Sequence, residues 1–203
     1  KGQNAAGGRA EGVAQAPEYL EFKRSLEDVD LGEVRRRLEV KLPFPLEGKL
    51  TFEVQAAIPV NTPQHLKNYR LNGTATLPRV SIAGVEMTDV HSRLRFEKGI
   101  LELQELKGRT PPPKGAPGVA GVFDGTARME LDPLGDLSAD VHVDHFPLAV
   151  MLNLLPGAAG SADGSLTGRV EGHAPAKTLT DATTWRGTGS LTSERLQSYG
   201  LAL

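Results

Sequence analysis

Four residues near the middle of the chain carry side chains that bind divalent metals. Asp140, His142 and Asp144 alternate with other residues, and His145 follows directly. Alternate residues of a β-strand share one face, so two carboxylates and an imidazole would face the same way. However, neighbours on one strand face are about 7 Å apart, whereas each ligand must lie about 2 Å from a shared ion. The pattern therefore predicts a solvated polar face, and a metal-dependent or carbohydrate-active enzyme using it is the third of three hypotheses for function.

Other signatures of catalysis are absent from the sequence. There is no cysteine, and no serine lies in a Gly-x-Ser-x-Gly motif, so the usual acyl-transfer nucleophiles are not indicated. Gly187-Thr188-Gly189 lies in a strand-like segment without a following helix, which does not match a phosphate-binding loop. We predict that the protein is not an enzyme and requires no cofactor and no metal.

The composition limits both the partners and the fold. The chain has 23 Lys and Arg against 25 Asp and Glu, a formal net charge of −2, so no basic field would attract nucleic acid. Its 23 Gly and 14 Pro with 5% aromatic residues favour short elements joined by turns over long helices.

The elements that would position these side chains are β-strands. In the segment after Leu46, Phe52, Val54, Ala56 and Ile58 alternate with polar residues, as expected of a half-buried strand. The same alternation returns in at least six later segments. Turn signals separate them, among them Ala162-Asp163-Gly164. The sequence thus predicts a mainly β fold: a curled antiparallel meander, an open, taco-like or half-barrel-like sheet, with one or two short helices.

Two short helices are expected beside the sheet. The first has apolar residues at helical spacing after Asp30, with Glu33 three residues on as in a capping box. The second would have Pro147 in its first turn and be stopped by Pro156-Gly157, which makes it about 13 Å long and too short to cross a bilayer. We expect residues 1–17 to be a flexible linker, 18–45 a short strand (YLEF) with the first helix, and 46–203 the antiparallel β domain, a fragment of a longer chain.

The β segments resemble one known family. GILELQELKGRT, FDGTARMELDPLGDLSADVHVDHFPLAVMLNLLPG and GSLTGRVEGHAPAKTLTDATTWRGTGSLTSERLQSYGLAL are similar to the C-terminal region of AsmA-like proteins of the bacterial envelope. The resemblance covers roughly Leu46 to Leu203. Its elements are glycine-containing and aliphatic strands around a short apolar helix, here Gly99 to Gly108, Gly121 to Leu131, Pro147 to Leu155, Gly164 to Gly172 and Trp185 to Leu191.

This resemblance implies a periplasmic protein, attached to the inner membrane in its full-length form, that handles or bridges lipids in outer-membrane biogenesis. The partners would be a lipid or acyl chain on the apolar concave face of the sheet, and other envelope proteins at edge strands. The alternative is a structural or protein-interaction β module with a closed core and pairing edge strands. The residues expected to line a lipid groove are apolar: Phe52, Val54, Ile58, Leu94, Phe96, Met129, Leu131, Val141, Val143, Leu148, Met151, Leu152, Leu166 and Val170.

Overall fold

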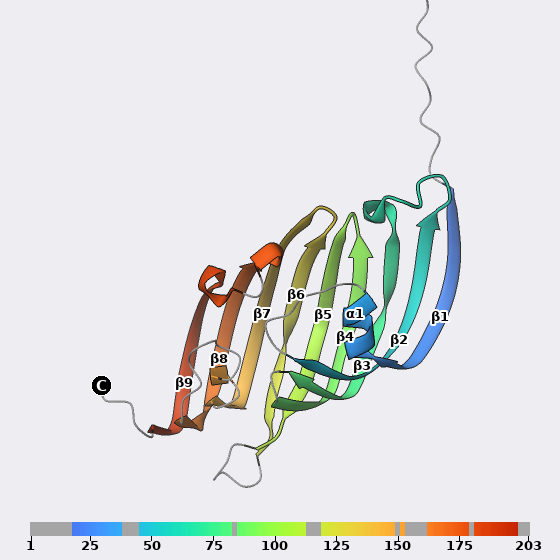
Figure 1. Cartoon of the computed structure of the whole chain (residues 1–203). Helices are drawn as coiled ribbons and strands as arrows, with labels where there is room; N and C mark the ends of the chain where they lie inside the picture. Colours follow the sequence, from blue (N-terminus) through green and yellow to red (C-terminus); the bar gives the residue numbers. More distant parts are fainter. Residues whose placement is uncertain are drawn as a thin grey trace, which may run out of the picture.

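The described part of the chain forms one antiparallel sheet of nine strands, in the order β1 to β9 (Figure 1). The computed structural model describes residues 18–37, 45–82, 85–112, 119–148, 151–152, 162–178 and 181–198. Each strand pairs with its neighbour in sequence, so β1 and β9 are the two edges of an open sheet. The predicted fold class, a mainly β open antiparallel meander, is confirmed. The strands are β1 (Tyr19–Asp30), β2 (Leu46–Pro59), β3 (Arg70–Ile82), β4 (Val85–Glu97), β5 (Ile100–Thr110), β6 (Gly121–Leu131), β7 (Leu134–Pro147), β8 (Ala162–Pro175) and β9 (Arg186–Ser198).

The helical elements are short. The helix α1 (Leu31–Arg37) begins where the sequence predicts, because Oδ1 of Asp30 accepts a hydrogen bond from the backbone N–H of Glu33 at 2.8 Å. Three 3-10 turns lie in connections: η1 (Leu66–Asn68), η2 (Ala176–Thr178) and η3 (Ala182–Thr184). Of the second predicted helix, Pro147 is instead the last residue of β7, and Leu148, Met151 and Leu152 have helical backbone. Its other positions lie outside the described residues, as does the predicted linker over residues 1–17.

The first strand is longer than the sequence predicts. The short strand expected at YLEF is a strand of 12 residues that pairs with β2 along the same sheet. Arg24 interrupts the apolar alternation, and the pairing register shifts between Leu26 and Val29, where Asp28 has φ of 56°. An edge strand tolerates both features, because charged side chains and bulges protect a free edge from unwanted pairing.

The turn predicted at Ala162-Asp163-Gly164 is wrong. These residues belong to β8, and the register shifts between Asp163 and Ser165. Gly164 has φ of 152°, a conformation that favours glycine. The glycine thus marks a bulge inside a strand rather than a chain reversal.

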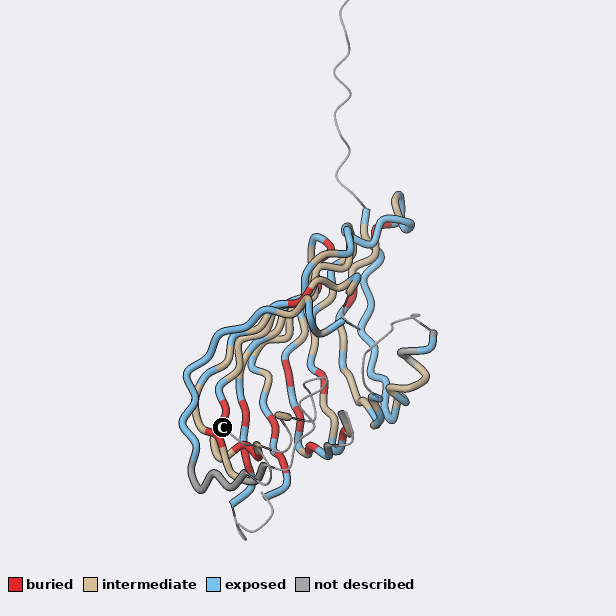
Figure 2. Tube along the Cα trace, turned by 60° about the vertical axis from the view of Figure 1, so that its left-hand side comes forward, coloured by how far each residue is buried: buried red, intermediate tan, exposed pale blue. Residues whose placement is uncertain are grey.

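The hydrophobic core lies on one side of the sheet. Figure 2 shows that the strands bend and that buried positions gather toward their lower ends in that view. The rings of Phe123 and Phe146 meet edge to face, with centroids 6.5 Å apart. Leu31 of α1 and Met151 pack against this core cluster. The buried members of the core cluster are Val80, Met87, Val90, Phe123, Val143 and Phe146.

No helix in the described part of the chain has both the length and the hydropathy needed to cross a bilayer.

Candidate functional site

Backbone pairing arranges the residues of successive strands in rows that cross the sheet. One row, the apolar row, contains one residue from each strand β2 to β9: Val54, Gly73, Leu94, Leu103, Ala127, Ala139, Gly172 and Gly187. The next row, the polar row, contains one residue from every strand: Lys23, Gln55, Asn72, Arg95, Glu102, Arg128, Ser138, His173 and Arg186. Side chains of adjacent rows point to opposite faces, so the sheet has an apolar face and a polar face.

The strand residues predicted to line a lipid groove follow the alternation of the apolar face. They come from β2 (Phe52, Val54, Ile58), β4 (Leu94, Phe96), β6 (Met129, Leu131), β7 (Val141, Val143) and β8 (Leu166, Val170). Phe96, Val143 and Leu166 are buried, and the others, with the helical Leu148, Met151 and Leu152, are half-buried. The apolar face is therefore partly covered rather than sealed along its whole width.

The structure divides these predicted residues between two regions. Val143 belongs to the core cluster, and Val141 and Met151 pack against it. Such side chains contact other parts of the protein, so less of their surface is left for a ligand. Phe52, Val54, Leu94, Met129 and Leu131 lie outside this cluster and are half-buried, so they are the better candidates for contact with an apolar ligand. Phe96 also lies outside the cluster, but at 2% exposure it has little surface to offer.

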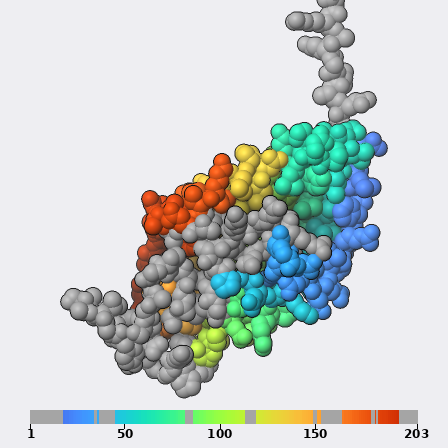
Figure 3. Space-filling model, in the orientation of Figure 1, coloured from blue at the N-terminus to red at the C-terminus, as the bar shows by residue number. Residues whose placement is uncertain are grey.

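Three residues of β1 extend the apolar face to an exposed edge. Leu20 is 61%, Phe22 37% and Leu26 47% exposed, and they pair with Ile58, Ala56 and Phe52 of β2. In Figure 3, β1 forms the right-hand margin of the molecule. We call these three residues the β1 apolar edge. The sequence prediction missed them, although their i, i+2, i+6 spacing was a usable signal, because Arg24 occupies the remaining position of the pattern.

A glycine of the apolar row near the other edge of the sheet also faces open space. A Cβ atom added to Gly172 of β8 would meet no atom within 4 Å. In contrast, a Cβ on Gly108 of β5 would lie 2.4 Å from Cζ of Phe123. Both positions lie in strands, so the difference reports how densely the side chains pack at the two places.

The predicted polar face over β7 does not assemble a metal site. No group of three metal-binding side chains comes together among the residues that the structure describes. Asp140 instead accepts a hydrogen bond from Nε of Arg169 at 2.7 Å. Asp144 accepts one from Oγ1 of Thr167 at 2.9 Å and pairs with His145. Each acid is therefore held by a neighbouring protein group rather than aimed at a common point.

These contacts also set the ionisation of the two acids. The hydrogen bond from Arg169 lowers the pKa of Asp140, and its positive charge acts in the same direction. The hydrogen bond from Thr167 lowers the pKa of Asp144, followed by that from His145. Both carboxylates are thus stabilised as anions, the opposite of what a general acid requires.

Comparisons with known proteins found no match. No family model, no curated protein and no solved structure matches the chain. The candidate site is therefore defined by the geometry of the sheet alone: an apolar face that is packed around the core cluster and exposed at β1.

Proposed function

We propose that the chain is a non-enzymatic module of the bacterial envelope, AsmA-like, whose apolar sheet face binds lipid acyl chains during outer-membrane biogenesis. The observation that carries the proposal is the β1 apolar edge, which continues the half-buried apolar residues of β2 to a free margin of the sheet. In a soluble domain such an exposed apolar strip marks a contact site for another apolar surface.

The dimensions of the apolar face suit a hydrocarbon chain. Strands lie about 4.8 Å apart, so nine strands span roughly 38 Å. One leaflet of a bilayer contributes about 15 Å of hydrocarbon, which would cross about four strands. Each buried methylene contributes about 0.8 kcal/mol, so an acyl chain can bind without a specific polar contact. A periplasmic location and attachment to the inner membrane in a full-length form belong to the same proposal.

The first test measures lipid bound to the purified chain. We expect organic extraction to release phospholipid that mass spectrometry detects, and we expect the extracted protein to take up a fluorescent fatty acid. Phe22→Glu should weaken uptake at least about tenfold, since it places a charge in the apolar strip. Ser25→Glu is the matched control, because Ser25 is exposed on the same strand but faces the other way.

Two results would reject the lipid proposal. One is a preparation free of lipid that also fails to take up the fatty acid. The other is equal loss of uptake in Phe22→Glu and Ser25→Glu, which would mean that negative charge on β1, and not the apolar strip, controls the interaction.

The second candidate function is a protein-interaction module, and the position of β9 as the last strand of the described sheet favours it. Residues 186–193 are all exposed, and from Gly187 to Ser193 no side chain is charged and none is proline. Charged side chains and prolines are the residues that protect edge strands in natural sheets, and β1 has Lys23 and Arg24. An unprotected edge can accept a further strand by backbone hydrogen bonding.

A substitution within β9 separates the second candidate from the first. If copies of the chain pair through this edge, sedimentation should detect a dimer that Gly189→Pro removes, since proline cannot donate to a β ladder. Fatty acid uptake should be unchanged in that variant if the apolar face is the lipid site. A strictly monomeric chain would argue against pairing between copies.

A further inference from the structure

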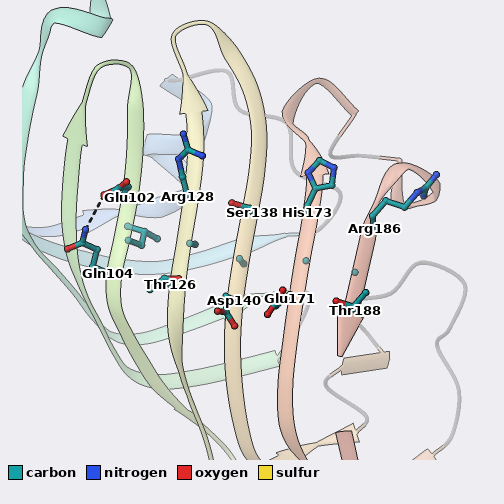
Figure 4. Close-up of a pocket in the computed structure, with 15 residues that line it drawn as sticks. Glu102, Gln104, Thr126, Arg128, Ser138, Asp140, Glu171, His173, Arg186 and Thr188 are labelled. Atoms are coloured by element: carbon teal, nitrogen blue, oxygen red, sulfur yellow. Dashed lines mark hydrogen bonds between the residues drawn. The ribbon is translucent and has the colours of Figure 1, made fainter. Parts of the chain in front are cut away.

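The polar face of the sheet is hollowed across its width. Three hollows are lined by described residues: one of about 850 Å³ lies over β5 to β9 (Figure 4), and two of about 290 Å³ and 530 Å³ lie over β1 to β5 and β1 to β3. Gln104 lines the first and second hollows, while Lys23, Gln55 and Asn72 line the second and third. These shared residues make the three hollows neighbours along the polar face, and we call the row of hollows, which runs across the strands, the polar trough.

The floor of the polar trough is backbone. It follows the apolar row, whose side chains point to the opposite face, and three of its eight positions are glycines, at Gly73, Gly172 and Gly187. The polar row forms one wall. The other wall includes Thr74, Gln104, Thr126 and Thr188, and Figure 4 shows the last three along the depression.

The charges that line the trough nearly balance. The cations are Lys23, Arg70, Arg93, Arg95, Arg128 and Arg186, and the anions are Glu21, Glu53, Glu102, Asp140 and Glu171. Several already have partners within the protein.

Arg95 pairs with Glu97 at 2.6 Å, and Arg128 pairs with Glu130 at 3.5 Å. A polyanion or a polycation would therefore find as much repulsion as attraction along the trough. The lining favours a ligand that is neutral or carries both signs of charge.

The shape favours a linear ligand. The hollows of the trough extend from β1 to β9, so a linear ligand can contact all three, whereas a compact molecule would occupy only one. Its lining repeats at the strand spacing of about 4.8 Å, which is close to the length of one sugar unit in an extended glycan. The amide, hydroxyl, carboxylate and guanidinium groups of the walls include both donors and acceptors, as sugar hydroxyls require.

We propose that the polar trough binds a linear polysaccharide with neutral or zwitterionic units, lying across the strands at about one sugar per strand. Among the described lining residues, Phe22 is the one Phe, Tyr or Trp, and its ring position alternates to the apolar face. Hydrogen bonds alone then hold each sugar, so the interaction is weak per unit and grows with chain length. This inference concerns the face opposite the lipid proposal and does not depend on it.

The test is a titration of the chain with cellobiose and cellohexaose, followed by the side-chain amide NMR signals of Gln55, Asn72 and Gln104. We expect cellohexaose to shift these signals with a dissociation constant at least about tenfold lower than that of cellobiose. Oligogalacturonate, which is anionic, should bind no better than cellohexaose. No binding, binding without length dependence, or shifts confined to the apolar face would overturn the proposal.

Two threonines of β3 supply a matched pair of variants. Thr74 lines the trough, whereas Thr76 lies on the same strand and face but outside it. Thr74→Leu should weaken cellohexaose binding at least about fivefold, and Thr76→Leu should change it less than about twofold. If Thr74→Leu fails to fold by circular dichroism, Gln104→Ala provides the same test. Equal effects at the two threonines, or tighter binding of an extended hydrophilic peptide to the same amides, would contradict a glycan site.

Discussion

Two regions of the apolar face, the core cluster and the β1 apolar edge, have the same kind of residue in different surroundings. Around the core cluster, Phe123 is 9% exposed and its ring packs against Phe146, with Leu31 of α1 on the same cluster. At the β1 apolar edge, Phe22 is 37% exposed. The strands themselves cover neither of these two regions. The difference teaches that a second layer of packing, and not strand alternation, decides which apolar residues stabilise the fold and which stay available to a ligand.

The largest expected effect on stability comes from replacing a phenylalanine by alanine in both the core cluster and the β1 apolar edge. Phe123→Ala should reduce the free energy of unfolding by about 3–5 kcal/mol, because it removes buried ring contacts and leaves a cavity. Phe22→Ala should cost less than about 1 kcal/mol, because much of that ring already contacts water. Urea denaturation of both variants measures the contrast. Equal losses would mean that the β1 apolar edge is packed in solution.

Two glycines allow the same substitution at a densely packed position and at an open position of the sheet. Gly108→Ala should destabilise by about 1–3 kcal/mol, since the new methyl group would overlap the ring of Phe123 and approach Cγ2 of Val90 at 3.0 Å. Gly172→Ala should be neutral or stabilising by about 0.5 kcal/mol, because its methyl group enters open space and reduces the freedom of the unfolded chain. Thermal unfolding of the pair gives the answer, and a destabilising Gly172→Ala would show that β8 is covered there.

Substitution of the N-cap residue of α1 tests whether this helix stabilises the core cluster. Asp30→Ala should cost about 1 kcal/mol, because the N–H of Glu33 loses its acceptor at the start of the helix. Asp30→Asn keeps an acceptor oxygen and should restore most of the loss. Circular dichroism during urea denaturation distinguishes the two variants, and an unchanged Asp30→Ala would mean that the cap contributes nothing to Leu31 packing.

The smallest effect is expected from an ion pair on the polar face. Arg169 holds the pKa of Asp140 below its ordinary value of 3.8, so the pair contributes stability above that pH. This contribution disappears as the pH falls through the lowered pKa of the folded state. Asp140→Asn should therefore lose less stability than the unmodified chain between neutral and strongly acidic pH. The difference should be small because both side chains are well exposed.

Thermal midpoints over this pH range measure the ion pair, with Asp124→Asn as an exposed control on the same face. A larger acid dependence in Asp140→Asn than in the unmodified chain would contradict the pairing with Arg169.

Much of the fold was predictable from the sequence because period-two alternation is a local property. Phe52 and Val54 share a face whatever covers them. The alternation failed as a guide where one residue broke it, at Arg24 in β1, and where a glycine could equally mark a turn or a bulge, at Gly164. In each case the pairing strand settled what the local pattern left ambiguous.

The candidate site was predictable only in part. The sequence identified apolar side chains that share a face, but it could not separate Val143, which lies in the core cluster, from Val54, which does not. It also gave no sign of the polar trough, since a hollow depends on how neighbouring strands bend and on side chains brought together from across the sheet.

By itself, the sequence determined that this chain forms strands with one apolar and one polar face, because side-chain direction follows from residue order along an extended backbone. Only the tertiary structure decided which part of the apolar face is covered and where the polar face is hollow. Coverage requires contacts between residues far apart in the chain, such as Leu31 with the core cluster, and such contacts leave no periodic trace in the sequence.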